Sequence, residues 1–265
     1  RNWTMRSAGE GRRAGFFRDT ISVAIRALRS ISRDSEAVYP ALIFPVFMYA
    51  ITVGALQDVA EQIPGLDYKA FQIPVAIIFA VTGVSRAVTL VTDIQTGYFD
   101  RLALTPMSRL ALLLGLTVAD FSLVVALTLP VLVLAFILGI RFESGPLGVL
   151  MFVLLSGLWG LACTGFPYAI ALKTGNPAAV NSSFLLFLPF VFLTTVFMPR
   201  EAMTGWMAIV VGYNPVTYLL DALRSLISAG WDWMALLQGW GAIAGVGVLS
   251  GTMALAALQG RTRRK

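Results

Sequence analysis

The sequence contains no histidine and only one cysteine, Cys163. Histidine is the commonest general base and a frequent metal ligand, so its absence excludes intramembrane Ser-His proteases and HExxH metalloproteases. A single cysteine forms no disulfide within the chain and no thiolate cluster for a metal. The sequence also lacks a GxxxxGK[ST] motif, and therefore a P-loop for nucleotide phosphates. We expect no catalytic residue, no metal site and no cofactor bound by this chain.

Charge is also scarce. Charged residues make up 13% of the chain and hydrophobic residues 57%, whereas a soluble domain carries about 25% charge. Six stretches are long and apolar enough to cross a bilayer, which takes roughly 20 residues of helix. The sequence therefore predicts an all-α, polytopic membrane protein with six transmembrane helices. These spans are 37–57, 70–92, 110–138, 146–172, 178–198 and 234–258.

Basic residues are unevenly distributed, and their positions predict the orientation in the membrane. They concentrate before residue 37, in the loop at 93–109 and after residue 260. By the positive-inside rule, both termini and the 93–109 loop face the cytoplasm. Basic residues at the chain ends, rather than on one face of a domain, argue against nucleic-acid binding. We expect a multi-pass protein of a plasma membrane, namely a bacterial inner membrane.

The chain before the first span divides into two segments. Residues 1–13 are rich in Arg, Gly and Ser, without periodicity, and are predicted to be a disordered basic tail. In residues 14–36, Phe17, Ile21 and Leu28 share one helical face and the arginines lie away from it, as in an amphipathic helix on an anionic membrane surface. A helix packed on a partner protein is the alternative. The remaining segment, 37–265, is the membrane domain.

Between the fifth and sixth spans, residues 199–232 contain two apolar pieces, 202–213 and 215–230. Asn214-Pro215 joins them, and Asp221 and Arg224 interrupt the second piece. Each piece is too short or too charged to cross the bilayer alone. We expect an extracellular re-entrant or interfacial helical hairpin.

Two ionisable residues lie inside predicted spans, Arg86 in the second and Asp120 in the third. An unpaired charge near the centre of a membrane helix costs about 2.5 to 3.5 kcal/mol. Both residues lie toward the cytoplasmic ends of antiparallel neighbours, within reach of each other. We predict an intramembrane ion pair between the second and third spans. A proton relay is the alternative.

The cytoplasmic loop at 93–109 is apolar where a solvated loop would be polar. Phe99, Leu102 and Leu104 lie beside Asp100 and Arg101, and Thr105-Pro106 ends the segment. A short helix here would offer an apolar knob to the groove of a partner. A loop folded back on the bilayer is the alternative.

These segments resemble a known family. Gly97, the run Phe99–Leu102 and the run Thr105–Arg109 are similar to the coupling-helix region of type-2 ABC exporter permeases. The resemblance is greatest to drug-export permeases of the daunorubicin-resistance type. Residues that resemble the family's extracellular hairpin are Trp206, Asn214, Pro215, Asp221 and Arg224.

The resemblance implies one half of a transmembrane dimer, homomeric or heteromeric, bound to two ABC ATPase subunits that carry ATP and Mg²⁺. Gly97, Phe99–Leu102 and Thr105-Pro106 would dock into the ATPase, and the first and fifth spans would line the dimer interface. This chain departs from the family pattern at Met203-Thr204-Gly205 and at Thr92–Gln95, where the usual Met-Pro and charged lead-in are missing.

The spans contain aromatic residues but no row of cationic residues that would attract a polyanion. The aromatic residues therefore indicate the class of substrate. An apolar cavity favours outward transport of a hydrophobic or amphiphilic drug or a membrane lipid. Export of a lipid-linked glycan, or an ATP-independent channel or scaffold, is the alternative. Residues that we expect to line the cavity are Phe71, Phe79, Phe184, Phe187 and Phe190.

Overall fold

The structure is a computed structural model that describes residues 35–82, 84–97 and 109–263. Throughout these residues the only regular secondary structure is helical. The predicted basic tail, most of the predicted amphipathic helix and the 98–108 part of the predicted coupling loop lie outside the described residues.

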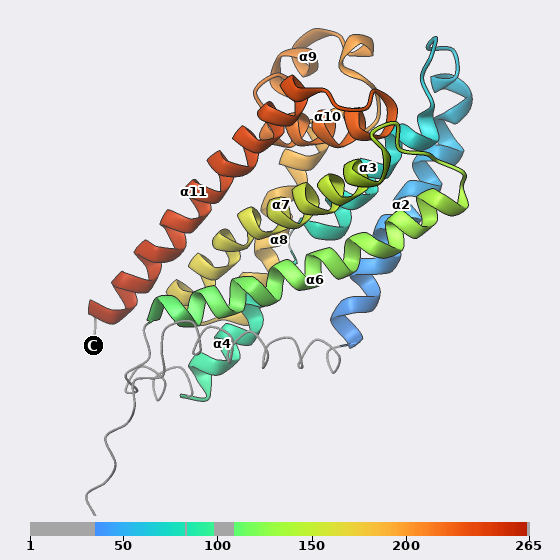
Figure 1. Ribbon diagram of the computed structural model, residues 1–265. Helices are drawn as coiled ribbons and strands as arrows, with labels where there is room; N and C mark the ends of the chain where they lie inside the picture. Colours follow the sequence, from blue (N-terminus) through green and yellow to red (C-terminus); the bar gives the residue numbers. More distant parts are fainter. Residues whose placement is uncertain (1–34, 83, 98–108, 264–265) are drawn as a thin grey trace, which may run out of the picture.

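Four helices are long and apolar enough to cross a membrane, and they run side by side at a slant through Figure 1. Each exceeds the roughly 20 residues that a bilayer core requires. They coincide with the first, third, fourth and sixth predicted spans. Their bounds are α2 Ser35–Ala60, α6 Arg109–Ile137, α7 Gly145–Thr174 and α11 Trp233–Arg263.

The other two predicted spans are shorter helices than expected. The second is divided into α3, Tyr68–Val81, and α4, Ala87–Gln95, with a non-helical connection between them. Thr82 has an extended backbone, so the helix stops there, at the polar and glycine-containing sequence Thr82-Gly83-Val84-Ser85-Arg86. The fifth ends early, because α8 covers only Pro177–Phe192.

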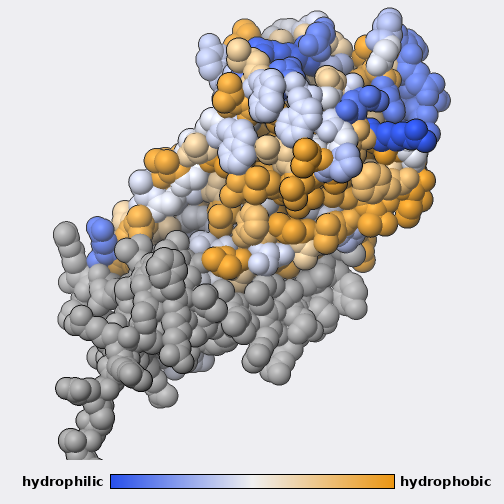
Figure 2. Space-filling model, viewed as in Figure 1, coloured by the Kyte–Doolittle hydropathy of each residue, from blue (hydrophilic) through white to orange (hydrophobic). Residues whose placement is uncertain are grey.

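The segment after α8 forms a short hairpin of helices. A 3-10 turn, η1 Arg200–Ala202, precedes α9, Gly205–Val211, and α10, Pro215–Ser228. Both helices lie within the two apolar pieces expected from the sequence. In Figure 1 they cap one end of the bundle, and Figure 2 shows hydrophilic residues gathered at that end above a broad apolar band.

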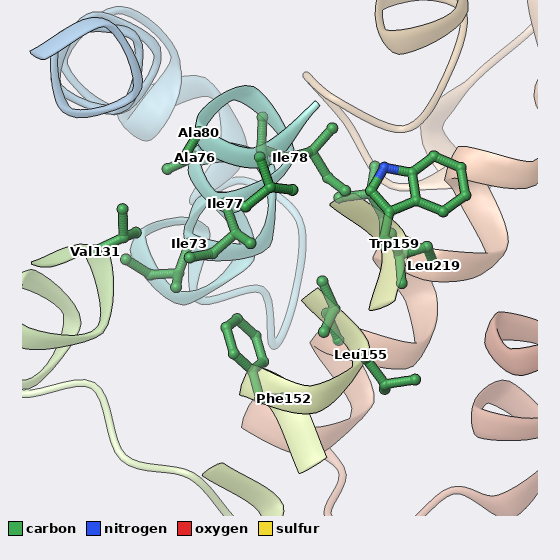
Figure 3. Packing of buried hydrophobic residues seen from close by; sticks show 14 of the residues in the cluster. Ile73, Ala76, Ile77, Ile78, Ala80, Val131, Phe152, Leu155, Trp159 and Leu219 are labelled. Carbon is green, nitrogen blue, oxygen red and sulfur yellow. The ribbon is translucent and has the colours of Figure 1, made fainter. Parts of the chain in front are cut away.

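Helix α7 is the centre of the bundle and packs against α6, α8, α10 and α11. Figure 3 shows its residues Phe152, Leu155 and Trp159 beside Ile77 of α3 and Leu219 of α10. Close approach to α11 depends on Gly165, because a Cβ at this position would overlap the backbone of Ser250. The Ser250 hydroxyl donates a short hydrogen bond to the Ala162 carbonyl across the same contact.

Candidate functional site

The break between α3 and α4 is surrounded by polar side chains from other helices. Asp120 of α6 is fully buried, and its Oδ1 accepts a hydrogen bond from the backbone N–H of Arg86 at 3.0 Å. Its Oδ2 accepts a hydrogen bond from the Tyr168 hydroxyl of α7 at 2.5 Å. On the other side of the break, the Trp159 indole N–H donates to the Thr82 hydroxyl at 3.2 Å.

The structure thus brings Arg86 and Asp120 together through the backbone of Arg86. Arg86 precedes α4 directly, and a helix N-terminus exposes N–H groups without intrahelical acceptors. A carboxylate satisfies such a donor and also complements the helix dipole. Asp120 therefore caps α4 within the bundle. Whether the Arg86 guanidinium pairs with this carboxylate remains a prediction.

The end of α8 is a second break, and here it is carbonyl groups that need partners. The Asn214 side-chain amide donates to the carbonyls of Phe190 and Leu193, at 2.6 and 2.9 Å. Its Oδ1 accepts from the N–H of Val216 and so caps α10, which begins at Pro215. One buried side chain thereby ends α8 and begins α10.

Helix α3 supplies two further donors to the same segment. The Gln72 amide donates to the carbonyl of Val196 at 2.9 Å and to the Tyr68 hydroxyl at 2.7 Å. The Tyr68 hydroxyl in turn donates to the carbonyl of Phe197 at 2.8 Å. Backbone without regular secondary structure is tolerated in an apolar environment only where the protein provides hydrogen bonds to its N–H and C=O groups. The bonds from Gln72 and Tyr68 do so for the carbonyls of Val196 and Phe197.

Arg224 of α10 completes this second cluster. Its guanidinium donates to the Thr195 hydroxyl and carbonyl at 2.6 and 2.7 Å, and to the Phe71 carbonyl at 3.3 Å. It also lies over the Phe71 ring, 3.5 Å from the centroid, and 3.6 Å from the Asp221 carboxylate. Burial lowers the pKa of Arg224 to about 9, while Asp221 opposes the shift. The group is therefore cationic at neutral pH and joins α10 to α3 and to the chain after α8.

The remaining predicted residues are dispersed. Trp206 of α9 is 67% exposed and takes no part in the cluster. Gly97 has a φ of 71° and ends the described part of the 93–109 loop. The other predicted coupling residues, Phe99, Asp100, Arg101, Leu102, Thr105 and Pro106, lie outside the described residues.

The predicted cavity-lining aromatics occupy different environments. Phe71 is buried beneath Arg224, and Phe79 is buried between Phe44 and Phe192. Phe187 packs edge-on against Phe166. Phe190 is 60% exposed. The side chain of Phe184 lies outside the described part of the structure, and the role of all five in a substrate path remains a prediction.

Several residues of the two clusters were not anticipated from the sequence. Tyr168, Gln72 and Thr195 carry no charge at neutral pH, so the scarcity of charge within the spans does not single them out. A glutamine in an apolar helix is itself a signal, because a buried amide without partners costs several kcal/mol in lipid. The nearly complete burial of Gln72 and Tyr168 identifies both as parts of these clusters.

The fold and these clusters define a class of protein. Several long apolar helices, together with shorter apolar helices whose ends are held by buried polar side chains, are typical of multi-pass membrane transporters. The model of the ABC-2 type transporter family matches residues 18–227, and the chain belongs to this family. The family resemblance inferred from the sequence is therefore confirmed.

Individual relatives agree with this assignment. The chain is 29% identical over 240 residues, 86% of its length, to daunorubicin resistance ABC transporter permease protein DrrB1 of Streptomyces coeruleorubidus, of which 83% is covered. It is 27% identical over 219 residues, 81% of its length, to the probable doxorubicin resistance ABC transporter permease protein DrrC of Mycobacterium tuberculosis, of which 79% is covered. The putative transport permease ycf38 of Cyanophora paradoxa is 26% identical over 222 residues, 80% of this chain and 75% of that protein.

Proposed function

We propose that this chain is the membrane subunit of an ATP-driven exporter that moves hydrophobic or amphiphilic drugs or lipids outward. Two permease chains would form the membrane part, and two separate ABC ATPase subunits would bind ATP and Mg²⁺. The observation that carries the proposal is the family match over residues 18–227, with relatives named as drug-resistance permeases.

The position of α4 supports a coupling role for the loop that follows it. Asp120 holds the start of α4 in the bundle, and α4 packs against α7 and α8. Its other end leads through Gly97 into the loop that resembles a coupling helix. A nine-residue helix spans about 14 Å. A movement of the loop would therefore be transmitted to the bundle core through α4 as one rigid helix.

The apolar surfaces of α2 and α8 support both the dimer and the substrate class. Both helices expose large apolar side chains, which suits contact with lipid, a second permease chain or an amphiphile. No charged group lies among these residues. They are Ile43, Phe47 and Ile51 of α2 and Leu185, Leu186 and Phe190 of α8.

The proposed topology has six crossings, with both termini in the cytoplasm and residues 199–232 outside. In this arrangement α3 with α4, and α8 with the chain that follows it, each complete one crossing. Cysteine labelling tests it in a chain that carries Cys163→Ala. Ala8→Cys and Thr262→Cys should react only from the cytoplasm, and Thr204→Cys only from outside. Labelling of position 204 from the cytoplasm would contradict this topology.

Two substitutions in the loop test the coupling role. Phe99→Ala or Leu102→Asp should weaken binding of the ATPase by roughly thirty-fold, because an apolar anchor at an interface contributes about 2 kcal/mol or more. Transport in vesicles that contain the cognate ATPase should be lost, whereas insertion into the membrane should be unchanged. Trp206→Ala, an exposed aromatic on α9, is the matched control and should bind the ATPase normally. Normal ATPase binding and transport by both loop variants would refute the coupling role.

A further inference from the structure

A cleft of about 420 Å³ lies between α6, α7 and α11 and meets the first polar cluster at Tyr168. It is lined by residues within Leu158–Tyr168 of α7 and Ile243–Leu255 of α11, and by Thr117 of α6. These three helices are among the four that are long and apolar enough to cross a membrane. The cleft therefore lies along membrane-spanning helices, at the depth of the bilayer hydrocarbon.

The length of the cleft is close to the hydrocarbon thickness of one leaflet. The lining segments extend over ten residue steps of α7 and twelve of α11, or about 15 to 18 Å along the helices. Half of a hydrocarbon core is about 15 Å thick. The lining begins before the midpoints of both α7 and α11 and ends at Tyr168 and Leu255, so the cleft reaches from the middle of the two helices toward their C-terminal ends.

The volume of the cleft suits a slender ligand. Binding sites for small molecules and cofactors have volumes of about 300 to 1,000 Å³, and the cleft, at about 420 Å³, lies within this range. A single alkyl chain is an occupant of suitable shape for a groove along two helices.

The chemistry of the wall also favours an alkyl chain. The wall consists mostly of aliphatic and small residues, and Tyr168 is its aromatic and ionisable member. Three of its hydroxyls are already used, because Ser250 donates to Ala162, Thr164 to Leu161 and Tyr168 to Asp120. The wall thus offers mainly apolar contact, and it suits a chain without polar groups.

Basic side chains stand beyond the same end of the cleft. Arg261 follows Ile243 by eighteen residues, or five full helical turns, and so lies on the lining face of α11. Its guanidinium donates to the carbonyl of Leu172, which places it beside Lys173 at the end of α7. Its Nε is buried and has no hydrogen-bond partner among the described residues. Arg261 lies about 9 Å beyond Leu255 along the helix, at the depth of a lipid headgroup.

We propose that the cleft is a binding site for an anionic phospholipid, with one acyl chain in the groove beside the contact of α7 with α11 and the phosphate at Arg261 and Lys173. The lipid belongs to the leaflet on the side of the α11 C-terminus, whichever face of the membrane that is. The site is separate from the transport activity, and it does not depend on the identity of the exported substrate.

Photolabelling of the full-length chain tests this proposal. The protein is reconstituted in vesicles of phosphatidylethanolamine and phosphatidylglycerol, with a trace of phosphatidylglycerol that carries a diazirine in its acyl chain. Mass spectrometry of the labelled peptides should place most of the label on the lining residues of α7 and α11. Equally strong labelling of the lining residues and of the lipid-exposed residues Val248 and Leu249 of α11 would indicate a general lipid shell. That result would overturn the proposal.

Two glycines of α11 provide a matched pair of variants. A Cβ on Gly251, which lines the cleft, or on Gly245, which does not, meets no atom within 4 Å. Gly251→Phe should fill the cleft and reduce its labelling at least fivefold, whereas Gly245→Phe should leave it unchanged. Equal labelling of the cleft in both variants would refute the site. The distribution of label on the unaltered chain tests the proposed site even if Gly251→Phe fails to fold.

The headgroup is tested separately with a diazirine-bearing phosphatidylcholine. The unaltered chain should label more strongly with the anionic lipid than with this zwitterionic one. Arg261→Gln with Lys173→Gln should lower that preference at least about fivefold, because each basic residue near an anionic surface contributes about that factor. Equal labelling of the unaltered chain by both lipids would refute the anionic headgroup.

Discussion

Two breaks in the helical bundle are stabilised by opposite chemistry. At the first, before α4, Asp120 accepts a hydrogen bond from the backbone N–H of Arg86. At the second, after α8, Asn214 and Arg224 donate to backbone carbonyls. The first break is the start of a helix and the second is the end of one.

The difference follows from the polarity of the helix. A helix start presents N–H groups and partial positive charge, and a helix end presents carbonyls and partial negative charge. An acid thus suits the first break, and a cation or amide suits the second. The type of residue near a break therefore indicates which end of a helix it serves.

Removal of the acid at the first break should have the largest effect. Asp120→Ala leaves two buried donors, the Arg86 N–H and the Tyr168 hydroxyl, without their acceptor. Each such loss costs about 1 to 3 kcal/mol, so the unfolding free energy should fall by about 3 kcal/mol or more. Thermal unfolding in detergent, followed by size-exclusion chromatography, measures this change.

The double variant Arg86→Ala with Asp120→Ala sharpens this test. It removes any stranded guanidinium charge but leaves the backbone N–H and Tyr168 unsatisfied. It should therefore recover only part of the lost stability. Full recovery would show that the side-chain ion pair predicted from the sequence accounts for the effect, and that capping does not.

Placing an acid at the second break should be nearly as damaging. Asn214→Asp keeps the oxygen that caps α10 but turns both donors toward Phe190 and Leu193 into acceptors. We expect a loss of about 2 to 3 kcal/mol in unfolding free energy, because a buried carboxylate would face two carbonyls. The same assay applies, and Asn214→Ala is the control, which loses the donors without adding charge. A stable Asn214→Asp variant would contradict the comparison between the two breaks.

Replacement of the cation by another cation should have an intermediate effect. Arg224→Lys keeps the charge but cannot reproduce the fork of bonds to Thr195 together with the bond to Phe71. We expect a loss of about 1 to 2 kcal/mol, seen as faster proteolysis of the 199–232 segment in vesicles. Arg224→Ala should increase this rate further. If lysine and arginine protect the segment equally, charge alone is sufficient at this break.

The smallest effect should come from the acid on α10. Asp221 lies 3.6 Å from Arg224, with its side chain 42% exposed, and the pair is spaced i to i+3 on one helix. Such pairs contribute about 0.5 kcal/mol or less. Asp221→Asn should therefore shift the unfolding midpoint only slightly. A loss as large as that of Arg224→Ala would place Asp221 within the cluster that holds the second break.

The long helices were predictable from the sequence, and the breaks were not. Hydropathy identifies α6, α7 and α11 because each is a single apolar segment longer than a bilayer. Proline does not mark the breaks, since Pro74 and Pro130 lie inside helices that continue past them. The chain stops being helical at Thr82, where the sequence shows no proline. The acceptor that caps the next helix, Asp120, is 34 residues away from Arg86.

The hairpin was easier to predict than the contacts that hold it. Asn214-Pro215 is a local signal, because asparagine caps a helix and proline suits its first position. That signal correctly indicated the start of α10. The bonds from Arg224 to Thr195 and Phe71 join segments 29 and 153 residues apart, and no local pattern specifies them.

The contact at Gly165 and Ser250 has a mechanical consequence. Because the two backbones touch and the Ser250 hydroxyl is bonded across the contact, α7 and α11 cannot slide or rotate against each other without breaking it. The two helices therefore act as one rigid unit. A rearrangement of the bundle that keeps this contact must therefore take place between this pair of helices and the helices around it.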